Sequence, residues 1–455
     1  MIVKNKYKQM ICGFIVIFLT FIPFSSAFSD SVKRAFENFS SFTMLGSGGR
    51  SFGNGSANLA QSDDCYGGSW NPAPLAILEQ MQIAVDGQST HRMENLNFGG
   101  SPDTNGFQTV SQFDMKFIGF AKPIKMFNHF MCVSVFYQKM VDLNRKWNIS
   151  FLEQNNEKNI NTIIDYQSEG DISSFSMAYA LLLKDHFCFG LTLNFYHNSI
   201  AGSGWSQTTF IRDVGHISDV EHDSKEFIDQ SYLLQDQYSF KGVNLNIGFL
   251  WKEVFQSNLN VAFLVKTPFN ADLHFERRDS GYGRENTIIE SENLTLKMPL
   301  SFGVGFAYKF SSFMIALDLY KKQWEDFVLI DESGKKTSPI TGNPIETSPI
   351  PSTFNYQLGI GYYGMKANQY LFPIRCGLFY EESPAENSKD KYWGGSMGFG
   401  ITPGSENFIR NHYSIDIAYQ YRFGNNVNKS ILSELNFSED IQEHSLNVSF
   451  IYYFL

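Results

Sequence analysis

The chain has 455 residues, of which 43% are hydrophobic and only 18% are charged, a composition that argues against a disordered protein. Its 46 acidic residues outnumber its 36 basic ones, and the formal charge of -10 disfavours a nucleic-acid-binding surface. Length alone suggests several soluble domains, but a content of 16% aromatic residues fits one large all-β unit equally well.

The first 27 residues have the features of a secretory signal peptide. Lys4, Lys6 and Lys8 precede an apolar stretch, residues 11–24, that is too short to cross a bilayer as a helix. Small residues follow and end in Ala27. We therefore expect export and cleavage after Ala27.

The next segment, residues 28–77, is rich in Gly, Ser and Asn. From residue 78 onward, by contrast, large apolar side chains alternate with small or polar ones, as in the strands of a membrane barrel. In residues 300–310, for example, Phe302 and Phe310 lie on one face, and Ser301 and Gly305 lie on the other. Fourteen segments show this pattern and are predicted strands: 78–86, 110–121, 129–138, 172–184, 187–198, 238–251, 257–266, 294–310, 312–321, 354–363, 371–381, 393–403, 412–423 and 445–454.

The connections between these segments alternate in length, short after each even-numbered segment and nearly all long after each odd-numbered one. Short periplasmic turns and long outer loops are typical of bacterial outer-membrane barrels. The sequence therefore predicts an all-β fold, a 14-stranded antiparallel transmembrane β-barrel over residues 78–455. A barrel of this width leaves a lumen to fill, so residues 28–77 are interpreted as an N-terminal hatch that plugs it.

Several motifs, in the same order along the chain, resemble those of the FadL-type family of outer-membrane proteins, which transport long-chain fatty acids. The hatch motifs are Gly46 to Arg50, Asp63-Asp64 and Asn71-Pro72-Ala73. Downstream matches lie in residues 299–303, 318–324, 373–377, 382–384 and 416–419. The resemblance implies a gating role for eight hatch residues, although a purely structural role is the alternative: Gly46, Gly49, Arg50, Asp63, Asp64, Asn71, Pro72 and Ala73.

The resemblance also implies passive passage of hydrophobic molecules, most of all long-chain fatty acids, through a lumen with apolar side chains. Eight inward-facing residues are candidate ligand contacts: Phe130, Phe136, Leu182, Leu264, Tyr363, Arg375, Ile451 and Tyr453. They could instead pack against the hatch. Inward charges such as Lys116, Arg375, Arg422, Asp318 and Asp416 could hold a carboxylate or could pair with one another. In this family the ligand is thought to leave sideways at a bend in the third strand, but residues 129–138 contain no Gly or Pro to mark such a bend, although Gly119 and Pro123 nearby could supply a distortion.

No catalytic, metal-binding or nucleotide-binding motif stands out in the sequence, so we expect neither an enzyme nor a cofactor. The acidic and histidine-containing stretch from Asp213 to Asp223 is interpreted as a solvated loop rather than a metal site. Apolar residues of the longer loop from Asn198 to Tyr238, such as Trp205 and Phe227, could form either a capture groove or a loop core. The four cysteines after the signal peptide are expected to be unpaired.

The expected partners are hydrophobic small molecules, either long-chain fatty acids or aromatic hydrocarbons, and the lipids of the outer membrane. We expect a monomer and no nucleic-acid partner. The alternative function is that of a non-transporting barrel scaffold, whose long loops would dock protein partners in a secretion or adhesion system.

Overall fold

The computed structural model describes residues 46–99, 104, 106–126, 129–154, 158–219, 224–280, 287–367, 369–403, 413–432 and 436–454. The predicted signal peptide and the first part of the predicted hatch, residues 28–45, lie outside these ranges. Within the described residues, no helix is long and apolar enough to cross a membrane.

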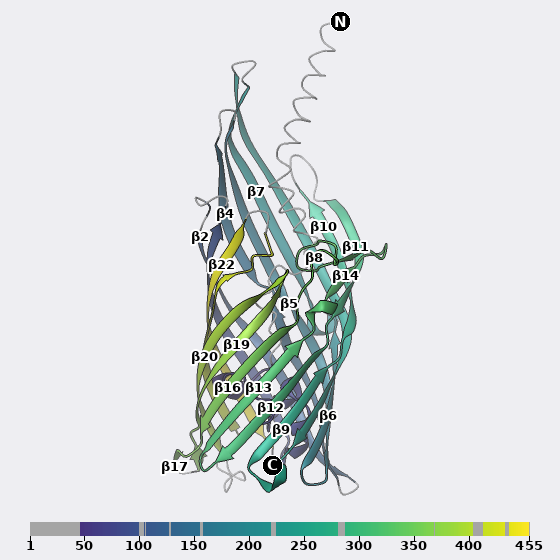
Figure 1. Cartoon of the computed structure of the whole chain (residues 1–455), viewed down its shortest axis with the longest axis vertical. Helices are drawn as coiled ribbons and strands as arrows, with labels where there is room; N and C mark the ends of the chain where they lie inside the picture. Colours follow the sequence, from purple (N-terminus) through teal and green to yellow (C-terminus); the bar gives the residue numbers. More distant parts are fainter. Residues whose placement is uncertain are drawn as a thin grey trace.

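Fourteen antiparallel strands form a closed barrel (Figure 1). The ring closes where the first strand pairs with the last, from Gln82 opposite Tyr453 to Phe98 opposite Phe437. The strands are β1 (Gln82–Phe98), β2 (Gly106–Met126), β3 (His129–Asp142), β5 (Lys158–Leu183), β6 (Phe187–Tyr196), β8 (Ser224–Trp251), β9 (Leu259–Lys266), β12 (Ser301–Phe310), β13 (Phe313–Lys322), β16 (Thr353–Tyr362), β19 (Ile374–Ala385), β20 (Ser388–Pro403), β21 (Tyr413–Val427) and β22 (Phe437–Tyr453). The predicted all-β, 14-stranded barrel is therefore confirmed.

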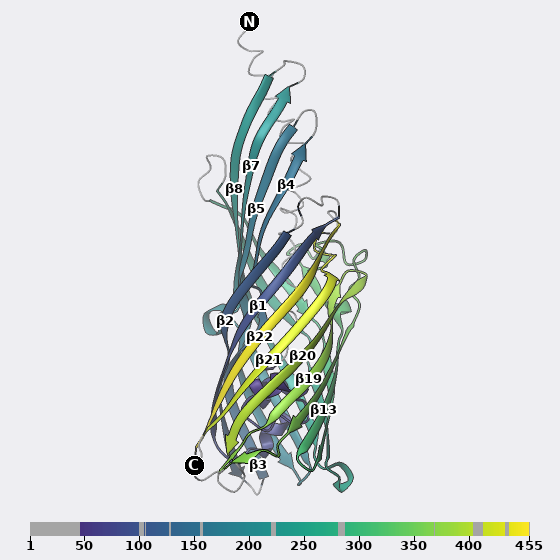
Figure 2. The ribbon, with the colours of Figure 1, turned by 90° about the vertical axis from the view of Figure 1, so that its left-hand side faces the viewer.

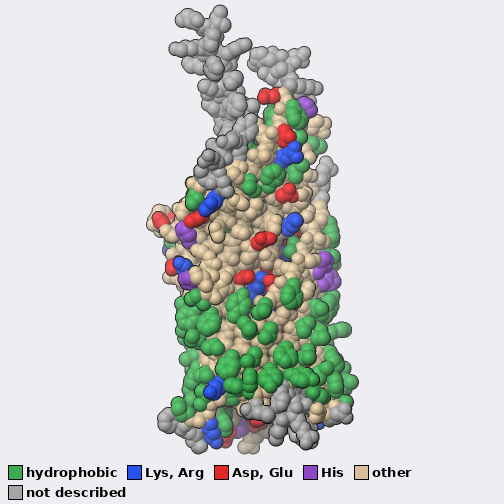
Figure 3. All heavy atoms as spheres, turned by 180° about the vertical axis from the view of Figure 1, so that it is seen from behind, with side chains coloured by type: hydrophobic (Ala, Val, Ile, Leu, Met, Phe, Trp, Pro, Cys, Tyr) green, Lys and Arg blue, Asp and Glu red, His purple; other side chains and the backbone are tan. Residues whose placement is uncertain are grey.

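The alternation of large apolar side chains with small or polar ones gives the strands an apolar outer face and a mostly small or polar inner face. On β21, Ile417 and Tyr419 are more than 40% exposed, whereas Asp416 and Ala418, which alternate with them, are buried. Such outer residues form a belt of apolar side chains around one half of the barrel (Figure 3). A band of this kind is what contact with lipid requires, since the backbone groups of the wall pair between strands and leave the side chains to meet the lipid.

One end of the barrel carries short connections and the other carries long ones, and we call these the turn end and the loop end. At the turn end, Ser311 and Ser312 alone join β12 to β13, and η5 (Val254–Gln256) and the small hairpin of β17 (Lys366–Ala367) and β18 (Tyr370–Leu371) lie in two other turns. The C-terminal strand β22 also ends here (Figure 1). At the loop end, α5 (Asn198–Ala201) and η6 (Trp324–Asp326) lie in the connections.

Beyond the belt, the sheet of the wall continues past the loop end of the barrel as an extension that we call the upper sheet (Figure 2). It joins the extended parts of β5 and β8 to β4 (Arg145–Gln154), β7 (Gly204–Asp219), β10 (Phe269–Asp279), β11 (Thr287–Met298), β14 (Val328–Ile330) and β15 (Lys336–Thr337). Most of the strands in this part of the sheet were predicted as loops from the sequence. The predicted strand 294–310 covers the end of β11 as well as β12. Pro299 lies in the gap between them, where a residue without an N–H group interrupts the ladder.

The described part of the hatch folds inside the turn-end half of the barrel. It contains α3 (Gly49–Gly53), α4 (Gly67–Trp70) and η3 (Ala73–Ile77), followed by the first wall strand at Gln82. Its apolar residues, such as Leu59, Tyr66 and Leu75, join inward-facing wall residues in one buried cluster. The hatch is thus held by a hydrophobic core that it shares with the wall.

Candidate functional site: the hatch and the lumen

Wall glycines let the hatch backbone lie directly against the barrel. A Cβ atom on Gly398 of β20 would lie 2.8 Å from the Cα of Gly53, and one on Gly305 of β12 would lie 2.5 Å from the Cβ of Leu59. A Cβ on Gly377 of β19 would overlap the backbone of Gly55. No larger residue fits at these positions without moving the hatch. Other inward glycines in the same role are Gly190, Gly248 and Gly359.

Side chains of the wall satisfy the backbone groups of the hatch. Asp318 of β13 accepts hydrogen bonds from the N–H groups of Asn58 and Leu59, at 2.7 and 2.8 Å. Asp86 of β1 accepts one from Gly48 at 3.0 Å. Ser396 of β20 accepts one from Gly55 at 2.9 Å and donates to the carbonyl of Gly53 at 3.1 Å.

These contacts satisfy hatch N–H groups that would otherwise be buried without partners. Ser449 of β22 adds another, accepting from the N–H group of Gly49 at 3.0 Å.

The predicted gating residues fall into two groups, and the first surrounds Arg50. Its guanidinium lies 2.6 Å from the carboxylate of Asp63 and 3.6 Å from that of Asp64. Asp63 is the more exposed of the two acids, and burial raises the pKa of Asp64 to about 6, with Arg50 acting in the opposite direction. Gly46 lies against the indole of Trp70, where a Cβ would lie 2.6 Å from the ring.

The second group forms the turn into η3. The Asn71 amide donates to the carbonyl of Leu59 at 3.0 Å, and its oxygen accepts from the N–H group of Ala73 at 3.1 Å. Pro72 precedes the first residue of η3, which suits its fixed φ. The backbone of Pro72 also lies against Gly190 of β6. This arrangement fixes the end of the hatch to the wall.

Most of the predicted ligand contacts pack against the hatch. Phe136 stacks on Phe117 at 5.3 Å between ring centroids, and its ring lies against Gly68 of α4. The same buried cluster contains Leu264, Ile451 and Tyr453, with Leu182 packed against it. These side chains share one buried cluster with hatch residues. This arrangement corresponds to the alternative stated above, that the inward apolar residues pack against the hatch.

The other three predicted contacts lie in different surroundings. Phe130 lies near the turn end of β3, is 49% exposed, and has the Lys125 ammonium 4.9 Å from its ring centre. Tyr363 follows β16, and the guanidinium of Arg375 lies 5.6 Å from its ring centre. Arg375 itself is buried and pairs with Asp416 at 2.5 Å.

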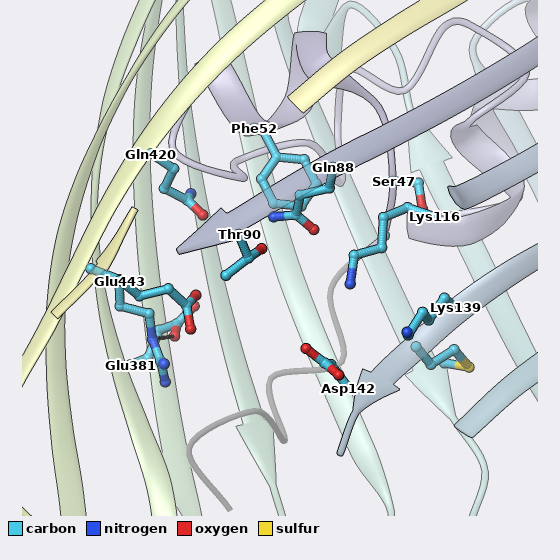
Figure 4. Close-up of a pocket in the computed structure, with 13 residues that line it drawn as sticks. Ser47, Phe52, Gln88, Thr90, Lys116, Lys139, Asp142, Glu381, Gln420 and Glu443 are labelled. Carbon is cyan, nitrogen blue, oxygen red and sulfur yellow. Dashed lines mark hydrogen bonds and ion pairs between the residues drawn. The ribbon is translucent and has the colours of Figure 1, made fainter. Parts of the chain in front are cut away.

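A first cavity lies on the loop-end side of the hatch, where polar and charged residues surround it (Figure 4). Glu381 pairs with Arg422 at 3.0 Å, and Lys139 pairs with Asp114 at 2.7 Å. Lys116 extends into the cavity without an ion pair to any carboxylate of the described residues. With a volume of about 110 Å³ the cavity is smaller than the ~300–1,000 Å³ of typical ligand pockets. A long ligand therefore requires the hatch to move.

A second cavity, of about 300 Å³, lies on the turn-end side of the hatch. Hatch residues including Arg50 and Asp63 form one side, and the wall contributes Leu250, Met314 and Tyr363. The hatch thus separates two cavities within one barrel.

Much of what holds the hatch was not predicted from the sequence. Asp86, Ser396, Ser449 and the wall glycines were not singled out, and the charge of the first cavity contrasts with the apolar lumen that we expected. The signal in the sequence that could have revealed these contacts was the recurrence of Gly at inward positions of several strands. Within the described residues no group of His, Cys, Asp and Glu could hold a metal ion, and the four cysteines there are free. Residues 220–223 of the acidic stretch lie outside the described ranges.

Neither known family profiles nor curated proteins give a match to this sequence. Solved structures do. A FadL homologue from Pseudomonas aeruginosa superposes with a TM-score of 0.57 at 13% identity, over 90% of this chain and 99% of that one. The toluene transporter TbuX from Ralstonia pickettii gives 0.52 at 12% identity, over 91% and 100% of the chains. The monoaromatic hydrocarbon channel CymD gives 0.51 at 15%, over 91% and 99%.

The fold and the site define a class, that of membrane-spanning β-barrels plugged by an N-terminal hatch. Within this class the chain has the FadL-type fold, as the sequence resemblance predicts.

Proposed function

We propose that this protein is an outer-membrane channel for passive, hatch-gated uptake of hydrophobic molecules, and that its substrates are long-chain fatty acids. The loop end then faces the outside of the cell and the turn end faces the periplasm. The single observation that carries the proposal is the hatch itself, which seals the lumen between two cavities. A seal of this kind suits a channel that opens for particular molecules.

The names of the similar structures support the broad part of the proposal. They are a FadL homologue, a toluene transporter and a monoaromatic hydrocarbon channel. The apolar belt fits insertion in a membrane, and the gate-like hatch fits passage without an energy source.

The charges of the first cavity support the finer part, a substrate with a carboxylate. Lys116 offers an ammonium group, whereas Arg422 and Lys139 are already paired with Glu381 and Asp114. Lys116 interacts electrostatically with the buried Asp86 but forms no ion pair with a described residue, and a cation in this state gains from meeting an anion. A fatty acid supplies that anion together with an alkyl chain, whereas a hydrocarbon supplies only the chain.

The test compares two labelled substrates of equal chain length, a long-chain fatty acid and the corresponding alkane, in cells that lack their own transporter. The variants are the unchanged protein, Lys116→Gln and the matched control Lys146→Gln on the exposed face of β4. We expect Lys116→Gln to reduce fatty-acid uptake several-fold and to leave alkane uptake unchanged. Equal effects on both substrates would argue against carboxylate recognition, and no uptake of either by the unchanged protein would argue against transport.

One observation favours the scaffold function as a second candidate. The sheet of β4, β5, β7 and β8 rises well beyond the barrel and offers a large surface for protein partners (Figure 2). If the unchanged protein is correctly inserted but takes up neither substrate, this sheet is the place to look for such partners.

A further inference from the structure

We propose that the ligand leaves this channel directly into the periplasm, through the cavity on the turn-end side of the hatch, between the hatch and the wall strands β8, β9, β12 and β13. This inference rests on the proposed function and adds the exit route and its site. The alternative route is a sideways exit through β3 into the membrane.

The turn-end half of β3 forms a continuous wall. Its pairing with β2 runs without a shift from Phe117 opposite Gln138 to Met126 opposite His129. Its pairing with β5 is regular from Met131 to Lys139, and the shift comes only between Lys139 and Val141. A sideways gap here would break backbone hydrogen bonds in contact with lipid, and each unsatisfied group costs several kcal/mol.

The residues that line the cavity on the turn-end side are complementary to an amphipathic ligand. Leu250 and Met314 of the wall and Ile77 of the hatch provide apolar contacts, while Arg50 and Lys309 provide cations. Its volume of about 300 Å³ reaches the lower end of the range for ligand pockets, ~300–1,000 Å³. An alkyl chain and its carboxylate would both find matching groups here.

One contact between the hatch and the wall on this side is long: the hydrogen bond from the Asn260 amide of β9 to the carbonyl of Ala60 measures 3.4 Å. Asp63, the partner of Arg50, is more than half exposed. Displacement of Asp63 from Arg50 by a ligand carboxylate would replace one ion pair by another.

The route can be tested by placing a photo-crosslinking amino acid at single sites and supplying a radiolabelled long-chain fatty acid during uptake. The sites are Phe52 in the first cavity, Met314 in the turn-end cavity and Val133 on the lipid face of β3. Leu446, on the lipid face of β22, measures labelling by fatty acid dissolved in the membrane.

We expect labelling at Phe52 and Met314, and labelling at Val133 no stronger than at Leu446. Labelling at Phe52 and Val133 above the Leu446 level, without labelling at Met314, would overturn the periplasmic route and favour the sideways one. If uptake is absent and Phe52 is also unlabelled, the proposed function itself fails, which is a distinguishable result.

A cavity-filling pair of variants gives an independent check. Met314→Trp should lower fatty-acid uptake several-fold at equal surface level while the crosslinker at Phe52 still labels. Leu446→Trp makes the same kind of change on the lipid face and should leave uptake unchanged. Normal uptake by Met314→Trp would contradict the proposed exit.

Discussion

The carboxylate of Asp318 accepts a hydrogen bond of 2.7 Å from the backbone N–H group of Asn58 and thereby joins β13 to the hatch. The same oxygen accepts a second hydrogen bond, from Leu59. A hydrogen bond contributes about 0.5–1.5 kcal/mol net, so this one buried side chain adds to the attachment that the shared hydrophobic core provides.

Replacement of Asp318 by Ala should therefore loosen this part of the hatch. The two N–H groups would be left buried without a partner, at a cost of about 1–3 kcal/mol each. Hydrogen–deuterium exchange of the hatch peptides in lipid or detergent should show faster exchange around Asn58. Asp272→Ala, at an exposed position of β10, is the control and should leave hatch exchange unchanged.

Two glycines of neighbouring strands allow a matched test of the close approach. Gly377→Ala should push the hatch away from β19, because the new methyl group overlaps the backbone of Gly55. Gly395→Ala on β20 should be tolerated, since a Cβ there meets its nearest atom at 3.6 Å. We expect Gly377→Ala alone to raise ion conductance in planar bilayers. Equal conductance of both variants would show that this contact does not seal the lumen.

A charge on the apolar belt should be costly, whereas a charge on the upper sheet should not. Ile417→Arg places a guanidinium among the exposed apolar side chains of β21, at a cost of about 2–4 kcal/mol if the site lies near the bilayer centre. Leu152→Arg changes an apolar residue on β4 that is more exposed than Ile417 and should have no effect. The measurement is the urea dependence of folding into lipid vesicles. A similar loss for both would contradict the position of the belt.

The buried charges at the loop end of the barrel should contribute to stability as a unit. Arg145 and Glu439, both fully buried, form an ion pair, and Glu94 lies 2.8 Å from Arg92 and 3.5 Å from Arg145. Glu439→Gln keeps the size of the side chain but leaves an excess positive charge, which should cost about 3–5 kcal/mol of unfolding free energy.

The control for this change is an exposed ion pair. Arg212 and Asp229 are 2.8 Å apart on the upper sheet, and both are close to half exposed. Asp229→Asn should leave the urea midpoint unchanged, because solvent screens such pairs. If Glu439→Gln also had no effect, the buried charges would contribute nothing beyond packing.

The wall could be predicted from the sequence because lipid imposes a strict rule on every strand that it touches. Successive residues of β21 have to face lipid and lumen in turn, and the sequence shows that alternation directly. The upper sheet follows no such rule. β7 and β10 both pair with β8, outside the apolar belt, so no alternation between lipid and lumen marks their residues, including the buried Trp205 and Phe275.

The hatch site was only partly predictable, for a related reason. Sequence motifs pointed to Arg50, Asp63 and Asn71, but the groups that hold the hatch are hundreds of residues away in the chain. Asp318 is 260 residues from Asn58, and Ser396 is 341 residues from Gly55. Only closure of the barrel brings such pairs together, and no local pattern records which wall residue faces which hatch residue.

The length of β8 has a consequence for the cell surface. Its 28 residues, at a rise of about 3.3 Å each, extend over roughly 90 Å, about three times the ~30 Å hydrocarbon core of a bilayer. One uninterrupted strand therefore runs from the periplasmic turn to a point far above the lipid headgroups. In the proposed orientation this end of β8 lies outside the cell and, together with β7, projects farther from the barrel than the other labelled strands (Figure 2).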